Sequence, residues 1–371
     1  MKFSDIPGHE NVKSRLRDMA DSGRLPHALL LIAPTGSGEM MLARAFAQYL
    51  HCTGRKPGDT DSCGVCPSCR QHQSLNHVDL HFSYPVLKKG TVTVSDDWLA
   101  EWREFLKDDP WMDLRRWSAL LGKPDGQPVI YADEADNLRR KLSMSARSSN
   151  LNIALMWLPE KMHPATANGL LKLIEEPEAG TLFLLVTNSA ADVLPTIYSR
   201  CRRIELRRLS DADVVAAIGP GIDHAEAVAA AHISEGNYIA ARDYLGSDET
   251  RRNLDLFMRL MRLAHQRKVG DLKVWSEEVA ALGRLSVCRF MEYCQRMVRE
   301  NFILNLHVPE LNYMTGSEQQ FSSRFCPFIN ERNVEQLIAE FNDAETDIRG
   351  NGSAKMVLFD LAIKVIILLK A

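Results

Sequence analysis

The chain has 371 residues, of which 45% are hydrophobic and 25% charged, and its formal net charge is -3. This length allows two or three domains with sizeable cores, and the ordinary globular composition excludes a disordered or fibrous chain. The charge balance excludes a strongly basic nucleic-acid-binding protein, so any contact with DNA would be a local patch or be shared with other chains. Residues 1–5 lack the apolar core of a signal peptide, and the apolar segment 354–370 is interrupted by Asp360 and Lys364. We therefore expect a cytoplasmic protein without a membrane span.

The first 208 residues alternate short apolar runs with amphipathic helical patterns, which predicts an α/β sheet with crossover helices. Between the second and third runs, a helical pattern over residues 165–176 stops at Pro177. The apolar runs are continuous rather than alternating, which is typical of parallel strands covered on both faces. These runs are residues 28–32, 153–158 and 182–186.

A glycine-rich turn follows the first apolar run. Residues 33–40 read Ala-Pro-Thr-Gly-Ser-Gly-Glu-Met, and a helical pattern begins there. This order predicts a phosphate-binding P-loop cradled by Gly36 and Gly38, with a plain strand–turn–helix connection as the alternative. However, Glu39 replaces the phosphate-binding lysine and Met40 the magnesium-binding hydroxyl. A carboxylate about 4 Å from a phosphate oxygen repels it by roughly 4 kcal/mol at an effective dielectric constant of about 20. We therefore predict a vestigial loop and no ATP bound to this chain.

Four of the eight cysteines form a C-x10-C-x2-C-x2-C pattern: Cys52, Cys63, Cys66 and Cys69. Four thiolates complete a closed tetrahedral site, which predicts a structural Zn²⁺ ion. Because the expected compartment is reducing, a metal is favoured over disulfides. Unrelated free thiols are the alternative.

Residues 129–136 end in Asp-Glu-Ala-Asp and resemble the acidic Walker B strand, in the form found in helicases. From Ala135 onward, however, apolar residues recur at helical spacing, which predicts an acidic helix start. The Walker B position then falls at the end of residues 153–158, where Trp157 and Leu158 replace the acidic pair. No carboxylate would then hold magnesium or polarise the attacking water.

Arg200 lies just before a predicted rim strand, between Ser199 and Cys201. A planar guanidinium suits the charge that develops on the γ-phosphate of a neighbouring subunit, which predicts an arginine finger acting in trans. Residue type alone favours the alternative, a solvated surface arginine. The arginines that follow are expected to form a solvated face, with contact to DNA phosphates as the alternative: Arg202, Arg203, Arg207 and Arg208.

Helical patterns dominate the rest of the chain. After residue 208 small-residue helices are expected, and beyond residue 247 long helical periodicities continue without strand signals. The tail over residues 356–369 is apolar around most of its circumference, so it has to be buried in its own domain or against a neighbour. Nearer the N-terminus, the tryptophan-rich segment 82–130 is expected to pack as a helical insertion, with a partner surface as the alternative.

Together these motifs resemble the clamp-loader family of AAA+ proteins, in particular the delta-prime-type subunits of bacterial DNA polymerase III. The resemblance lies within residues 8–208, and the spacing of segments 168–177 and 199–201 is its most specific feature. It implies three parts. They are an α/β P-loop AAA+ module with a zinc knuckle (1–208, knuckle 52–69), an all-α lid (209–247), and an all-α collar for oligomerisation (248–371).

The resemblance also implies a function. The chain would be a non-catalytic subunit within the DNA polymerase III holoenzyme, with no ATPase activity of its own. Its partners would be delta and gamma/tau-type subunits in a hetero-pentamer that loads the sliding clamp onto primer-template DNA. Arg200 would complete the ATP site of an adjacent gamma/tau-type subunit. In the lid, Ile239 stands where active members carry a sensor arginine, with Arg242 nearby.

Three alternatives remain open at this point. One is an ATP-hydrolysing gamma/tau-type motor subunit, which Glu39, Met40 and Trp157 disfavour by the charge argument. Another is a helicase built on residues 133–136, which requires that segment to form a strand beside the P-loop. The last is an AAA+-derived zinc scaffold outside replication.

Overall fold

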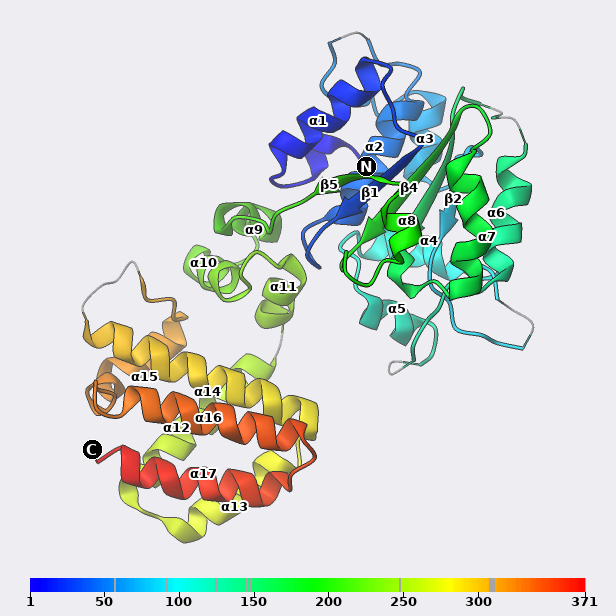
Figure 1. Cartoon of the computed structure of the whole chain (residues 1–371). Helices are drawn as coiled ribbons and strands as arrows, with labels where there is room; N and C mark the ends of the chain where they lie inside the picture. The colour runs from blue at the N-terminus through cyan, green and yellow to red at the C-terminus, as the bar shows by residue number, and fades with distance from the viewer. Residues whose placement is uncertain are drawn as a thin grey trace. The chain divides into compact units, whose positions relative to one another are not determined.

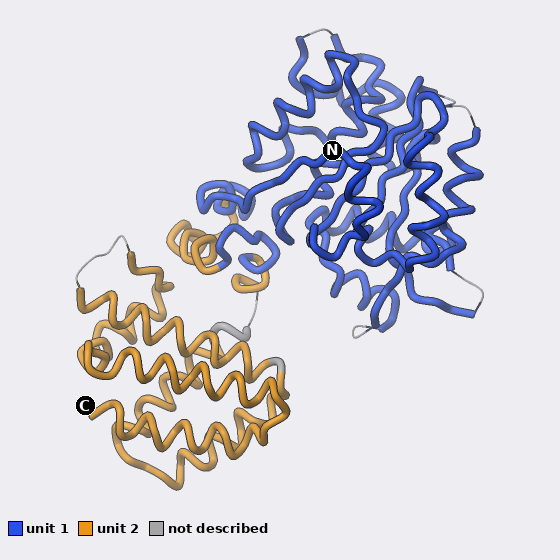
Figure 2. Tube along the Cα trace, viewed as in Figure 1, with its two compact units in different colours: residues 1–219, 234–241 blue, residues 220–233, 242–371 orange. Residues whose placement is uncertain are grey.

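The computed structural model describes residues 1–56, 58–90, 93–123, 126–144, 146, 148–246, 248–306 and 311–370 (Figure 1). The chain forms two compact units. Unit 1 comprises Met1–Gly219 with Ser234–Ala241, and unit 2 comprises Pro220–Ile233 with Arg242–Ala371 (Figure 2). The segment 209–247 is thus divided between the two units. That it forms a separate lid domain remains a prediction.

Unit 1 is built around a five-stranded sheet in the order β2-β3-β4-β1-β5, in which every neighbouring pair is parallel. Ala28 of β1 lies opposite Phe183 of β4, and Leu29 lies opposite Arg202 of β5. Because all pairs are parallel, the carboxyl ends of the strands meet along one edge of the sheet. The strands are β1 (Ala28–Ile32), β2 (Leu80–Ser83), β3 (Asn152–Trp157), β4 (Thr181–Thr187) and β5 (Arg202–Glu205).

Helices cover both faces of this sheet. Alternate residues of the central strands, such as Leu30 and Met156, share one apolar core with helices α6 (Asp133–Leu142), α7 (Pro164–Glu175) and α8 (Pro195–Tyr198). Helix α2 (Glu39–His51) contributes nothing to that core but contacts β1, β3 and β4. Burial on both sides explains why the predicted strands read as continuous apolar runs.

The tryptophan-rich insertion packs on the sheet through aromatic contacts. Trp102 and Trp117 are fully buried, and Trp102 stacks on Tyr84 with 3.8 Å between ring centroids. The Trp102 ring also lies 5.5 Å from that of Trp157 in β3. The helical insertion is thus confirmed over its described part. The remaining elements of unit 1 are η1 (Phe3–Asp5), α1 (Glu10–Asp21), α3 (Pro67–Gln73), η2 (Ser95–Trp98), α4 (Leu99–Asp108), α5 (Leu114–Leu120), η3 (Pro159–Lys161) and α9 (Asp211–Ile218).

Unit 2 is helical throughout its described residues. Its core contains the fully buried Trp275, Phe290 and Phe341, and the apolar tail is buried in this core through Leu358 and Val365, as predicted. No helix among the described residues is long and apolar enough to cross a membrane. Helix α11 (Tyr238–Gly246) begins in unit 1 and ends in unit 2. The other helices are α10 (His224–Ile233), α12 (Asp248–Gln266), α13 (Val269–Ala280), α14 (Arg284–Asn305), α15 (Gly316–Phe325), η5 (Cys326–Phe328), α16 (Val334–Arg349) and α17 (Ala354–Leu368).

Candidate functional site

The carboxyl edge of the sheet brings three turns together. The glycine turn of residues 33–38 follows β1, Glu160 follows β3, and Asn188 follows β4. In open parallel sheets, ligands bind in the crevice outside the carboxyl ends of the strands. This edge of unit 1 is therefore the candidate nucleotide site.

The glycine turn has the predicted strand–turn–helix form. Gly36 has φ 79° and Gly38 has φ 82°, a left-handed conformation in which a side chain is strained. Gly38 is the N-cap of α2, which begins at Glu39. The two glycines are thus required by the backbone itself, whether or not a phosphate binds there.

Side chains of the chain itself pack against both glycines. The side-chain oxygen of Asn237 lies only 2.0 Å from where a Cβ of Gly36 would stand, and the backbone N–H of Tyr238 donates to the Gly36 carbonyl at 3.1 Å. The Trp111 indole lies 3.3 Å from a Cβ built on Gly38 and stacks on the Tyr238 ring, with 4.1 Å between centroids. Residues from distant parts of the sequence therefore occupy the surroundings of the turn.

The residue at the lysine position is turned inward. Glu39 is 2% exposed, and one of its carboxyl oxygens accepts a hydrogen bond from Asn188 Nδ2 at 2.7 Å. Burial raises the pKa of Glu39 to about 7. The backbone N–H of Asn188 donates to Glu160 at 3.1 Å, and burial also raises the pKa of Glu160. Asn188 therefore links two carboxyl groups, while the adjacent Met40 is 1% exposed.

The Asp-Glu-Ala-Asp segment lies on a helix, as predicted. Residues Asp133–Leu142 form α6, and Glu134 accepts hydrogen bonds from the backbone N–H and the hydroxyl of Ser95 at 2.8 and 2.9 Å. The helicase alternative required a strand beside the P-loop and is therefore excluded. At the position expected for Walker B, β3 ends in Trp157, which is 1% exposed.

Arg200 lies between α8 and β5, which is an edge strand of the sheet. Its Nε donates to Glu175 Oε1 at 2.5 Å, Nη2 forms an ion pair with the same carboxylate, and Nη1 donates to the Thr196 carbonyl at 2.7 Å. A guanidinium has five N–H donors, and Nη1 also donates to Ser199 Oγ at 3.5 Å, so only Nη2 keeps one more N–H. The Arg200 side chain is 35% exposed and that of Glu175 is 43% exposed. Ser199 is also exposed, whereas Cys201 is buried in the core.

The arginines that follow are exposed, as expected for a solvated face: Arg202, Arg203, Arg207 and Arg208. Arg203 lies over the Tyr198 ring at 4.9 Å from its centroid, and Arg208 pairs with Glu235 at 3.1 Å. Two of the four thus have partners within unit 1.

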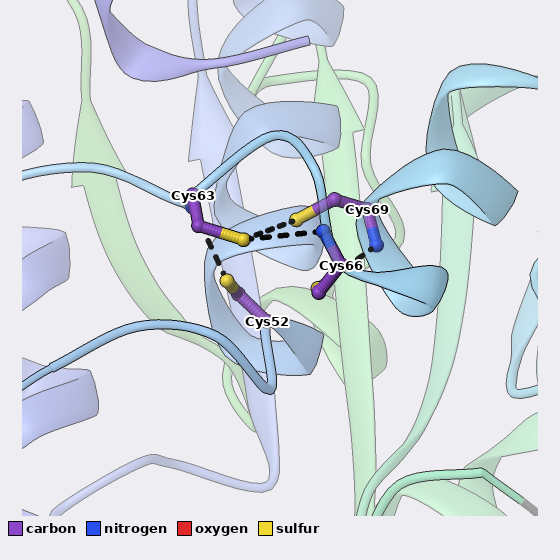
Figure 3. A group of neighbouring side chains, drawn as sticks. All are labelled: Cys52, Cys63, Cys66 and Cys69. Carbon is purple, nitrogen blue, oxygen red and sulfur yellow. Dashed lines mark hydrogen bonds between the residues drawn. The ribbon is translucent and has the colours of Figure 1, made fainter.

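The predicted cysteine knuckle is assembled between α2 and α3 (Figure 3). The four sulfurs of Cys52, Cys63, Cys66 and Cys69 lie within 4.8 Å of one another, and those of Cys63 and Cys69 are 3.9 Å apart. Tetrahedral zinc with Zn–S bonds of about 2.3 Å requires sulfurs roughly 3.8 Å apart. Backbone N–H groups of Val65 and Cys66 lower the pKa of the Cys63 thiol, whereas burial raises the pKa of the Cys52 and Cys69 thiols. The donor set therefore fits Zn²⁺.

Three buried histidines lie beside the knuckle, with ring nitrogens within 4.8 Å of one another: His51, His72 and His77. His51 Nε2 donates to a backbone carbonyl at 2.9 Å, so its Nδ1 accepts from His72 Nε2, also at 2.9 Å. His77 Nδ1 accepts from the Asp79 N–H at 3.2 Å, so its Nε2 donates to Ser68. Burial lowers the pKa of His51 to about 4 and of His72 to about 2. His51 and His72 thus bond to each other and His77 bonds to its own neighbours, so we interpret the three rings as parts of hydrogen-bonded networks rather than as a second metal site.

Several residues of the site escaped sequence reasoning. Asn188, Glu160 and Glu175 are single polar residues after strands or at a helix end, and nothing in their local spacing marks them. Trp111 and Asn237 lie far from the glycine turn in sequence. A signal for Asn188 and Glu160 did exist, since polar residues directly after predicted parallel strands meet at the same edge.

The parallel sheet, with a glycine turn at its carboxyl edge and helices on both faces, defines an α/β module of the P-loop type. The chain belongs to the protein family described as DNA polymerase III, delta subunit, whose sequence model matches residues 8–210. It is of the delta-prime clamp-loader type.

Named relatives agree with this assignment. The delta-prime subunit of Haemophilus influenzae is 31% identical over 49% of this chain and 43% of its own length, and that of Escherichia coli is 33% identical over 49% and 42%. The chain thus spans less than half of the length of these relatives. A DNA polymerase III gamma/tau subunit of Mycobacterium bovis is 27% identical over 56% of this chain and 29% of its own length.

Proposed function

We propose that this chain is a clamp-loader subunit of the cytoplasmic DNA polymerase III holoenzyme that does not hydrolyse ATP itself. In this role it acts on the ATP bound by a neighbouring gamma/tau-type subunit. With delta-type and gamma/tau-type subunits in a hetero-pentamer, it helps to load the sliding clamp onto primer-template DNA. The family membership supports the clamp-loader role. The residues of the glycine turn and of the Arg200 region support the proposal that the neighbouring subunit, and not this chain, hydrolyses ATP.

The observation that carries the proposal is the buried carboxyl of Glu39 at the P-loop lysine position. A carboxyl hydrogen-bonded to Asn188 and 2% exposed cannot supply the positive charge that a β- or γ-phosphate needs. The packing of Asn237, Tyr238 and Trp111 on the glycine turn also favours a closed site over an open one. Backbone amides alone can hold phosphates, so we propose loss of productive binding rather than loss of every phosphate contact.

Arg200 is proposed as the arginine finger for the neighbouring ATP site. Its contacts with Glu175 and Thr196 set the orientation of the guanidinium, and Nη2 retains an N–H for a phosphate oxygen. The edge position of β5 leaves this side chain partly exposed. An arginine finger contributes a factor of about 10³ or more to turnover.

The experiment is ATP turnover by the loader reconstituted with delta-type and gamma/tau-type subunits, sliding clamp and primed DNA. Arg200→Ala should lower kcat about 10³-fold without lowering the melting temperature of this chain. Arg200→Lys should rescue little, because an ammonium cannot reproduce the planar fork. Arg202→Ala, which removes an exposed arginine two positions away, is the matched control. Unchanged turnover in Arg200→Ala would show that the finger assignment is wrong.

The gamma/tau-type motor function is the second candidate, because gamma/tau subunits match the same region of the chain. Calorimetry of the isolated chain with magnesium-ATP, up to millimolar nucleotide, separates the two. Absence of binding is expected for the non-hydrolysing subunit. Tight binding with turnover would identify a motor subunit.

We also propose that the four cysteines hold a structural Zn²⁺ ion. Four thiolates leave no open coordination position, so the ion would join the end of α2 to α3 and take no part in chemistry. Metal analysis should find one zinc per chain, and Cys63→Ser should abolish it and lower the melting temperature. Cys288→Ser, at a buried cysteine of unit 2, is the control and should retain zinc. A full zinc content in Cys63→Ser would contradict the assignment.

A further inference from the structure

A groove of about 660 Å³ crosses the surface of unit 2 between α12 and α15. Its floor is apolar: Met258 and Met261 come from α12, Phe321 and Phe325 from α15, and Phe328 from η5. Phe257 of α12 lies beneath, with edge-on contacts to the rings of Phe321 and Phe325 at 6.1 and 6.0 Å. The two helices are thus held together from below, and their outer apolar side chains line the groove.

The charged residues that line the groove are all of one sign. These charged residues are Arg262 and Arg324; His265 also lines the groove, and no aspartate or glutamate does so among the described residues. The chain as a whole has 48 acidic residues against 45 lysines and arginines, so a purely basic lining is not its average surface.

The arginines of the groove also differ from their neighbour. Arg259, one turn before Arg262 on α12, holds Glu278 with two hydrogen bonds of 2.9 and 2.8 Å. Within the described part of the chain, neither Arg262 nor Arg324 has a carboxylate partner. Phe328 remains 37% exposed at the same groove. Apolar surface beside unpaired guanidinium groups is the pattern of a recognition surface rather than of a solvated face.

We propose that this groove binds an acidic amphipathic helix of another protein. A groove between two helices accepts a third helix through apolar anchors one turn apart, and the methionines can adapt to the shape of those anchors. Glutamate or aspartate side chains beside the anchors would form charge-assisted hydrogen bonds with Arg262 and Arg324. This inference concerns unit 2 alone and does not rest on the proposed role of Arg200.

The test uses the full chain and two synthetic fluorescent peptides. Each has about 16 residues, long enough for a marginally stable helix, with leucine and phenylalanine on one face. In one peptide the flanking positions are glutamate, and in its twin they are lysine. Fluorescence anisotropy should show that the acidic peptide binds at least tenfold more tightly than its twin.

Charge reversal supplies the decisive comparison. R262E/R324E should lose the acidic peptide and bind the lysine twin instead, whereas Phe328→Ala should weaken both peptides. R284E/R332E changes the net charge equally at exposed residues outside the groove and should behave as the wild type. Equal binding of the two peptides, or a preference that R262E/R324E does not reverse, would overturn the proposal. So would a concentration-dependent dimer in sedimentation that R262E/R324E abolishes, because the occupant would then be a second copy of this chain.

Discussion

The glycine turn and the edge of the sheet at Arg200, the two regions of unit 1 to which roles in ATP chemistry are proposed, have opposite character. At the glycine turn, the polar groups face inward: Glu39 is buried against Asn188, and Asn237 packs on Gly36. At the edge strand, Arg200 keeps a third of its surface exposed, and its partner Glu175 is more exposed still. One region has become part of the core, while the other presents a cation at the surface.

If the glycine turn no longer binds a nucleotide, as proposed, its contacts indicate how the emptied crevice is filled. A phosphate-binding turn that no longer serves its ligand would leave an open polar crevice at the sheet edge. Here the crevice is lined by hydrogen-bonded carboxyl and amide groups and packed with aromatic rings, which satisfies the buried polar atoms. Nothing comparable covers Arg200, and the ion pair with Glu175 orients the guanidinium at little energetic cost, as is usual for exposed pairs.

Restoring the P-loop residues is expected to have the largest effect on the glycine turn. E39K/M40T recreates the lysine and hydroxyl of an active loop, but the ammonium would be buried at the position of the Glu39 carboxyl, beside the Asn188 amide. We expect a loss of about 3–5 kcal/mol in the free energy of unfolding, measured by urea titration, and no magnesium-ATP binding by calorimetry. Submillimolar ATP binding by this variant would mean that only the two substitutions, and not the packing, closed the site.

The pH dependence of stability tests the buried Glu39 carboxyl. Its pKa is raised from 4.5 to about 7, so the folded state keeps a proton that the unfolded state releases first. The stabilisation is complete below pH 4.5 and is lost as the pH rises to 7, in total about 3 kcal/mol.

Glu39→Gln cannot titrate and should abolish this contribution. Urea unfolding at several pH values between 4.5 and 8 should therefore show the wild type losing stability relative to Glu39→Gln. Glu104→Gln, at an exposed glutamate, is the control. A constant difference between wild type and Glu39→Gln across the range would mean that Glu39 ionises normally in the folded chain.

A smaller effect, on loader turnover, is expected from changing the contact between Glu175 and Arg200. Glu175→Gln weakens the hold on Arg200 without removing the guanidinium, so loader turnover should fall about tenfold in kcat, equivalent to ~1.4 kcal/mol, with an unchanged KM for ATP. Glu175→Asp should recover part of the activity, and Glu176→Gln, at the adjacent exposed glutamate, should have no effect. If Glu175→Gln raises turnover, the carboxylate restrains the finger instead of positioning it.

Features that depend on residues close together in the sequence were predictable from the sequence alone. Continuous apolar runs predicted a parallel sheet covered on both faces, the helical spacing after Ala135 placed the Asp-Glu-Ala-Asp segment on a helix, and the cysteine spacing predicted a cluster of four sulfurs. Each of these signals lies within one element or one loop, so the local sequence determines it. The apolar tail is buried along one face, as predicted, whereas Met356 and Ile367 on its outer face are exposed.

The tertiary structure alone decided how the two ATP-related regions are built. Asn188 meets Glu39 across 149 positions of sequence, and Tyr238 reaches Gly36 from even farther away. Glu175 meets Arg200 because α7 and α8 pack on the same face of the sheet. The basic groove of unit 2 likewise depends on the packing of α12 against α15. Such contacts follow from the strand order and from side-chain packing between distant segments, which local spacing does not encode.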